Sequence, residues 1–173
     1  MIAYHVDRSA MLVPNQTINL FNNIKLDDIF TEYNNSFSNH GLQYLNQYSD
    51  SSVWELCLEF VRLKNFPHLP SRLQALFGVK TLEEALVWKG YISSQTNSKI
   101  NICKIEFSDC YEFDARWMTN PPLLNNQNNN YNFNQKSIAK MLEYSYKYWS
   151  KEFSSNPLPE LLIVSPIKIL EII

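Results

Sequence analysis

Glycine is scarce in this chain, with three in 173 residues. Rossmann and P-loop nucleotide sites need several glycines at fixed spacing, because the backbone must turn tightly and approach a phosphate closely. No such spacing occurs in the sequence, and no internal repeat is visible. The sequence therefore argues against both of these nucleotide-binding architectures.

Cysteine is also rare, and its number is odd. The three cysteines form no CxxC pair and no Cys/His cluster, so the sequence predicts neither a disulfide framework nor a metal site. Free thiols are typical of a reducing compartment.

Long apolar runs and a strong excess of one charge are both missing. No apolar run approaches the roughly 20 residues that span a bilayer, and the N-terminus has no basic region followed by an apolar one. We therefore expect a cytoplasmic protein with no membrane partner. The formal net charge of -2 argues against binding nucleic acid through a broad basic face. It does not exclude a smaller basic cleft.

The composition that is present is globular, with 45% hydrophobic and 14% aromatic residues. Its length suits one domain over residues 1–173. The asparagine-rich segment Asn125–Asn130 predicts a solvated loop. Apolar spacing predicts three helices, at Ser52–Lys64, Thr81–Tyr91 and Gln135–Phe153.

The first two predicted helices carry a start signal. Ser52 with Glu55, and Thr81 with Glu84, have the spacing of a capping box. The predicted apolar face of the first helix comprises Val53, Leu56, Cys57, Phe60, Val61 and Leu63. β-prone segments predict strands at Ala3–Asp7, Leu73–Val79, Ile100–Phe107, Tyr111–Asp114 and Leu161–Ile172, the last with a break or bend at Pro166. This order, which has no repeating βαβ unit, predicts an α+β fold.

Two polar residues stand out in the terminal strands. His5 lies where an apolar residue is expected, and Glu160 opens a segment that is otherwise almost wholly apolar. A carboxylate at the mouth of a buried strand is either a chain-end accident or a placed functional group. If the two terminal strands pair, both side chains would lie in one cleft.

Four segments in this order resemble the ADP-ribosyltransferase superfamily, which includes diphtheria-type and rifamycin-modifying transferases and toxins that modify nucleic acid. They are Tyr4-His5, the stretch Pro70–Phe77 with the helix led by Thr81, the strand Ile102–Phe107, and the acid-led strand Glu160–Val164. The second segment departs from the family pattern: it offers Ser71 and Arg72 with Phe77 in place of a clear Tyr or Ser-Thr-Ser motif, which is closer to the nucleic-acid-modifying branch.

The resemblance implies split mixed or antiparallel β-sheets with flanking helices, and NAD as a substrate. It implies that Glu160 and His5 are the catalytic residues, and that His5 acts by binding the adenosine ribose. Arg8 and Arg72 are candidate pyrophosphate ligands, because a guanidinium can bind phosphate oxygens with two donors. The remaining candidate NAD-binding residues are Tyr4, Ser71 and Phe77.

Each of these residues also has a plainer interpretation. Glu160 would be a solvated strand edge and His5 a satisfied core histidine. Arg8 and Arg72 would be surface cations or ion-pair partners of Asp7 and Glu83. Ser71, which follows a proline, would cap a helix or form a turn.

The expected function is a NAD-dependent mono-ADP-ribosyltransferase, a glycosyltransferase-class enzyme that moves ADP-ribose to a macromolecular acceptor and releases nicotinamide. The acceptor, protein or nucleic acid, is left open. The size suits a toxin, effector or phage-related modifier, with a neutralising antitoxin or regulator as a partner. The alternatives are a non-catalytic interaction module that retains the fold, and RNA 2′-phosphotransfer, which relies on more basic residues than the sequence offers.

Overall fold

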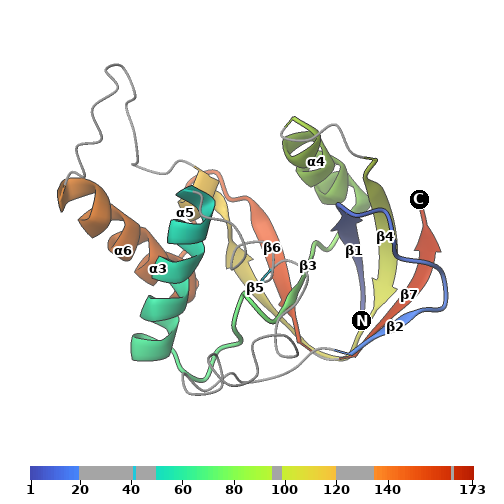
Figure 1. Cartoon of the computed structure of the whole chain (residues 1–173), viewed down its shortest axis with the longest axis horizontal. Coiled ribbons are helices and arrows are strands. Elements are labelled where there is room, and N and C mark those ends of the chain that lie inside the picture. Colours follow the sequence, from blue (N-terminus) through green and yellow to red (C-terminus); the bar gives the residue numbers. More distant parts are fainter. Residues whose placement is uncertain (20–40, 42–49, 95–98, 120–134, 165) are drawn as a thin grey trace.

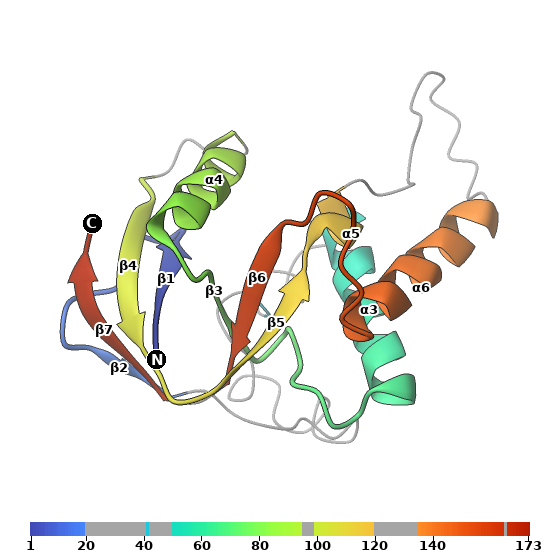
Figure 2. The same ribbon diagram turned by 180° about the vertical axis from the view of Figure 1, so that it is seen from behind.

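The computed structural model describes residues 1–19, 41, 50–94, 99–119, 135–164 and 166–173 (Figures 1 and 2). Within these residues the fold is α+β, with two antiparallel sheets and four helices. No helix in this part of the chain is both long enough and apolar enough to cross a membrane. The asparagine-rich segment Asn125–Asn130 lies outside the described residues.

The first sheet has the strand order β1-β4-β7-β2. Its strands are β1 (Ile2–Asp7), β4 (Asn101–Glu106), β7 (Ile167–Ile172) and β2 (Thr17–Ile18). The second sheet has the order β3-β6-β5, with β3 (Leu76–Gly78), β6 (Pro159–Ile163) and β5 (Cys110–Asp114). Because β6 is the central strand, its backbone is paired on both sides.

The two sheets adjoin along β1 and β3 (Figure 1). Tyr4 and Val79 exchange both backbone hydrogen bonds at this joint, each 2.8 Å long. A buried apolar cluster lies between the sheets and draws residues from both: Ala3, Cys103, Ile105, Phe107, Leu161, Ile163, Ile167 and Ile169. The joint and this cluster therefore hold the two sheets together.

Helices flank the sheets. The helices α3 (Asp50–Asn65) and α6 (Gln135–Trp149) pack together beside the second sheet, close to the short α5 (Arg116–Thr119), whereas α4 (Leu82–Ser93) lies against β1 and β4 (Figures 1 and 2). Side chains alternate along β6, so Leu161 and Ile163 face the first sheet while Leu162 faces α3 and α6. Glu160 shares the face of Leu162.

Most predicted strands are confirmed, and two differ. The predicted strand Leu73–Val79 shortens to β3, because Gln74 and Ala75 both donate backbone hydrogen bonds to the Ser71 carbonyl and form a turn. The predicted segment Leu161–Ile172 is interrupted around Pro166 as expected, and its two parts, β6 and β7, join different sheets, which was not predicted. Neither β2 nor α5 was predicted.

The predicted helices are present, with corrections at their ends. Thr81 caps α4, and its capping box with Glu84 is confirmed. The capping box at Ser52 is wrong, because α3 already includes Asp50. The third helix ends at Trp149 and not at Phe153, since Lys151 adopts a left-handed backbone conformation with φ of 61°.

The predicted apolar face of α3 is also largely wrong. Leu56 is 66% exposed and Phe60 is 58% exposed. The buried face instead mixes apolar with charged side chains: Trp54, Glu55, Leu58, Glu59, Val61 and Arg62. Buried charges are costly unless paired, and here Glu59 pairs with Arg62 on the same helix while Glu55 pairs with Arg72 in the turn before β3.

Candidate functional site

Glu160 is a buried carboxylate on the central strand of the second sheet. The residue is 4% exposed, and Phe113 on β5 pairs with it directly. Its strand is also held from α4, because the Trp88 indole donates a 3.1 Å hydrogen bond to the Pro159 carbonyl. The backbone that carries Glu160 is therefore fixed from three elements.

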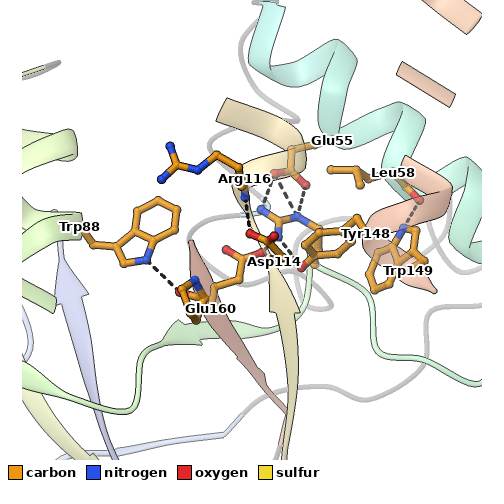
Figure 3. Close-up of polar contacts among 10 residues, drawn as sticks. Glu55, Leu58, Trp88, Asp114, Arg116, Tyr148, Trp149 and Glu160 are labelled. Carbon is orange, nitrogen blue, oxygen red and sulfur yellow. Dashed lines mark hydrogen bonds and ion pairs between the residues drawn. The ribbon is translucent and has the colours of Figure 1, made fainter. Parts of the chain in front are cut away.

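Two side chains hold one oxygen of Glu160. Arg72 Nη1 donates to Oε1 of Glu160, and Tyr148 from α6 donates its hydroxyl to the same oxygen at 2.6 Å. Arg72 Nη1 also donates to the Tyr148 hydroxyl at 2.7 Å. Figure 3 shows Glu160 on β6 and Tyr148 on α6 meeting in this cluster. The three polar groups therefore form a closed triangle.

Glu55 on α3 holds the opposite edge of the same guanidinium. Arg72 Nε donates to Oε2 of Glu55 at 2.9 Å, and Nη2 donates to Oε1 at 2.9 Å. The guanidinium also lies over the Phe77 ring, 4.6 Å from its centroid. Arg72 is 4% exposed and is committed to carboxylates, so this geometry favours the ion-pair interpretation over pyrophosphate binding. Its partners are Glu55 and Glu160, not Glu83.

Burial and charge act on the protons of this cluster. Burial raises the pKa of Glu160, while the Arg72 cation opposes that rise. Burial also holds the pKa of Tyr148 well above its usual value, so the phenol keeps its proton and serves as a donor. Although burial opposes it, the nearby Glu160 and Glu55 carboxylates hold the pKa of Arg72 well above its usual value.

Glu160 differs from every other buried carboxylate in the described residues. Asp7, Glu55, Glu59 and Asp114 each accept hydrogen bonds on both carboxylate oxygens. In Glu160, both hydrogen bonds fall on Oε1, and Oε2 has no hydrogen-bond partner within the described part of the chain. Among the described residues, the fully buried side-chain polar atoms without a partner are Trp54 Nε1, Ser145 Oγ and Ser154 Oγ. Oε2 of Glu160 is not one of them, so this unpaired acceptor keeps some access to solvent and can be reached by a ligand.

His5 presents a second acceptor. Its Nδ1 lies 2.6 Å from the Phe77 carbonyl oxygen, which can only accept, so Nδ1 carries the proton. Burial lowers the pKa of His5, which favours the neutral ring. The lone pair of Nε2 then has no hydrogen-bond partner among the described residues, and the ring is half-buried.

β3 connects the two acceptors. The Phe77 carbonyl binds His5, and Phe77 pairs with Leu162, two residues after Glu160 on β6. The Phe77 ring also packs on the guanidinium that holds Glu160. The expectation that the first strand pairs with the strand of Glu160 is wrong, because β1 pairs with β4 and β6 pairs with β3 and β5.

The remaining predicted site residues take mixed roles. Tyr4 is half-buried and packs beside the core around Val79. Arg8 is half-buried directly after β1. Its predicted ion-pair partner, Asp7, accepts hydrogen bonds from Ser9 and from the Leu12 backbone.

Ser71 has the turn role of its plainer interpretation. Its hydroxyl donates to Glu59 at 2.9 Å and accepts from the Leu73 backbone N–H at 3.2 Å. Glu59 in turn forms a two-point ion pair with Arg62. This neighbouring network is complete without any contact to Glu160 that the structure shows.

Sequence reasoning missed Glu55, Tyr148 and Trp88 as members of the site. Glu55 was assigned to a capping box, and the two aromatic residues lie within predicted helices, where no site role was assigned to them. One signal was available, since Glu55, Glu59 and Arg62 recur at i, i+4 and i+7 and so share a helix face. Within the described residues, no three His, Cys, Asp or Glu side chains gather as a metal site.

Comparison with known sequences gives a family for this chain. No curated protein matches it. Residues 3–173 match the family described as "Protein of unknown function (DUF2441)", which is nearly the whole chain. The protein therefore belongs to the DUF2441 family.

Proposed function

We propose that this protein is a NAD-dependent mono-ADP-ribosyltransferase that moves ADP-ribose from NAD to a macromolecular acceptor and releases nicotinamide. One observation carries the proposal: Oε2 of Glu160 and Nε2 of His5 are acceptors without a hydrogen-bond partner in the described residues. Each would accept a hydroxyl, and NAD offers ribose hydroxyls at both of its ends.

The fold supports this proposal at a coarser level. The ADP-ribosyltransferase resemblance implies split β-sheets with flanking helices, and the chain has two antiparallel sheets that adjoin along β1 and β3. In the same comparison His5 lies on the first strand and Glu160 on a late strand, and β3 joins these two strands. We also propose that these two sheets and their flanking helices have the ADP-ribosyltransferase arrangement.

The proposed chemistry gives Glu160 an electrostatic role. The bond between ribose C1′ and the nicotinamide nitrogen breaks, and its electron pair leaves with nicotinamide. The ribose then resembles the oxocarbenium ion of glycoside cleavage. A carboxylate that accepts a ribose hydroxyl through Oε2 would stabilise this cation, which is an effect worth roughly 3 kcal/mol or more. The acceptor nucleophile then bonds to C1′ and loses its proton.

His5 has a positioning role in this proposal. A neutral ring with the proton on Nδ1 accepts a hydroxyl of the adenosine ribose at Nε2, and no proton needs to move during the reaction. Arg8, directly after the same strand, is the better candidate of the two arginines for the pyrophosphate, because Arg72 is buried in ion pairs.

NAD binding tests the role of His5 separately from turnover. NAD at 100 times its dissociation constant should stabilise the wild-type protein by about 2.7 kcal/mol, which raises its melting temperature. His5→Phe removes the acceptor and should abolish this rise. His68→Phe, the same change at an exposed histidine in the turn after α3, should retain the rise. A wild-type protein that NAD does not stabilise would contradict the proposal.

A non-catalytic interaction module is the second candidate, and two observations favour it. Glu160 is 4% exposed and is bound into an ion-pair cluster, as a structural carboxylate would be. It also faces the helices, whereas Ala3, on the face of β1 that His5 shares, packs between the sheets. A module of this kind would not be stabilised by NAD, so the thermal measurement separates the two candidates.

A further inference from the structure

Glu55 and Glu160 are linked through Arg72, whose guanidinium contacts both carboxylates. Its two oxygens receive Nε and Nη2 of Arg72, which are the two donors on one edge of the planar guanidinium. A guanidinium held at two points on one edge cannot rotate in its plane. Its third nitrogen, Nη1, is then directed at Oε1 of Glu160.

We propose that Glu55 is a positioning residue for Glu160, which acts through Arg72 to hold Oε1 and so leaves Oε2 to meet the substrate. The substrate contact assigned to Oε2 rests on the proposed function. The coupling of Glu55 to Glu160 through Arg72 does not depend on it.

The helices that carry the cluster are themselves tied together. The Trp149 indole on α6 donates a 2.7 Å hydrogen bond to the Leu58 carbonyl on α3 (Figure 3). Trp149 directly follows Tyr148 on α6, and Leu58 lies about one helical turn after Glu55 on α3. The hydrogen bond therefore holds together the two helix segments that carry the Arg72 partners Tyr148 and Glu55. The Arg72 guanidinium is further confined by the rings of Phe77 and Tyr148, with centroids at 4.6 and 5.1 Å.

Charge couples the two carboxylates as well. The groups that act on Glu160 are the Arg72 cation, the Tyr148 hydroxyl and, at longer range, the Glu55 carboxylate. Phe113, which pairs with Glu160 from β5, is uncharged, and Trp88 from α4 donates to the carbonyl of the preceding residue, Pro159. The negative charge of Glu55 raises the pKa of Glu160, and removal of that charge should therefore lower it.

Glu55→Gln, with Glu59→Gln as its matched control, tests the inference. Glu59 lies one turn further along α3, is equally buried, and forms its own two-point ion pair with Arg62. The ¹³C chemical shift of the Glu160 carboxyl carbon is followed against pH, and Glu160→Gln assigns the signal. Glu55→Gln should lower the pKa of Glu160 by about one unit, whereas Glu59→Gln should leave it in place.

Kinetics give the second readout. With NAD as substrate, Glu55→Gln should lower kcat for nicotinamide release about tenfold with little change in KM, because the carboxylate is misplaced while NAD still binds. Tyr148→Phe should act on the pKa of Glu160 in the opposite direction, since the lost hydrogen bond had lowered that pKa.

The two proposals fail in different ways. A wild-type protein that releases no nicotinamide contradicts the proposed function, while the carbon titration still tests Glu55. If Glu55→Gln does not fold, the wild-type titration replaces it, because coupled carboxylates show both titration steps on both carbons. A Glu160 signal that titrates in one step, that does not move in Glu55→Gln, or that moves equally in Glu59→Gln would overturn the inference.

Discussion

Asp114 ends β5, and its carboxylate ties down the segment that leads into Glu160. Oδ1 accepts from the backbone N–H groups of Arg116 at 2.9 Å and Leu158 at 2.7 Å, and Oδ2 accepts from Ser154 at 2.8 Å. Asp114 is fully buried, and its bond to Leu158 is buried as well, whereas the bonds from Arg116 and Ser154 are partly buried. We predict that Asp114→Asn destabilises the protein strongly.

The size of the effect follows from these contacts. If the Asn amide oxygen replaces Oδ1, its NH2 group faces the Ser154 N–H, and that hydrogen bond is lost. A lost buried bond of this kind costs about 1–3 kcal/mol, and two charged bonds that become neutral cost about 1 kcal/mol more. We expect a total near 3 kcal/mol, or a fall of roughly 6–12 °C in the melting temperature.

Urea unfolding at pH 7, followed by tryptophan fluorescence, measures this loss. Glu106→Gln, an exposed carboxylate on β4, is the control and should change the free energy of unfolding by less than about 0.5 kcal/mol. Faster hydrogen exchange at the Ser154 and Leu158 amides should accompany the loss in Asp114→Asn.

The pH dependence gives an independent check. Hydrogen bonds from Ser154 and its neighbours hold the pKa of Asp114 below its usual 3.8, against the opposing effect of burial. The unfolded chain therefore binds more protons than the native protein as the pH falls below 3.8. The advantage of wild type over Asp114→Asn is complete above that pH and is lost as the pH falls through the native pKa. A loss under about 1 kcal/mol at pH 7, or one that does not shrink in acid, would refute this reasoning.

Two further predictions concern small residues. A Cβ added at Gly41 would overlap the Leu73 carbonyl, so Gly41→Ala should lower the free energy of unfolding by about 2 kcal/mol. Gly90 lies in an open position on α4, so Gly90→Ala should raise the free energy of unfolding by about 0.5–1 kcal/mol. Urea titration measures both changes. Of the three free thiols, Cys103 alone is buried, and burial raises its pKa to about 11, so it should react with an aromatic disulfide reagent only after unfolding. Cys57 and Cys110 are half-buried and burial raises the pKa of each, so both should react in the native protein, slowly but ahead of Cys103. Fast reaction of all three, or a stabilising Gly41→Ala, would contradict the packing described.

The elements that were predicted correctly are those that local sequence determines. Thr81 and Glu84 form their capping box within one turn of backbone, so the same pattern in the sequence and in the structure is expected. Ser52 and Glu55 have that spacing too, but Glu55 is taken by Arg72, a partner 17 residues away. A local pattern cannot reveal which of its side chains has a distant partner.

The candidate site likewise combines residues that local sequence reveals with partners that only the fold brings together. His5 and Glu160 were predicted because each is a polar residue in an apolar strand, which is visible in the sequence. The partners of Glu160 were missed because Arg72 and Tyr148 meet only when the turn before β3, α6 and β6 come together. The apolar face of α3 was misassigned for a related reason, since Leu56 and Phe60 look like core, whereas Glu55 is buried by its ion pair.

Nicotinamide release from NAD is the measurement that tests the central claim most directly. Purified wild-type protein is compared with Glu160→Gln, each with and without cell lysate as a source of acceptor. Our account predicts release by the wild type and a loss of about a hundredfold or more in the variant, because the carboxylate that faces the ribosyl cation is gone. No release by the wild type in either condition, or equal release by both proteins, would contradict it.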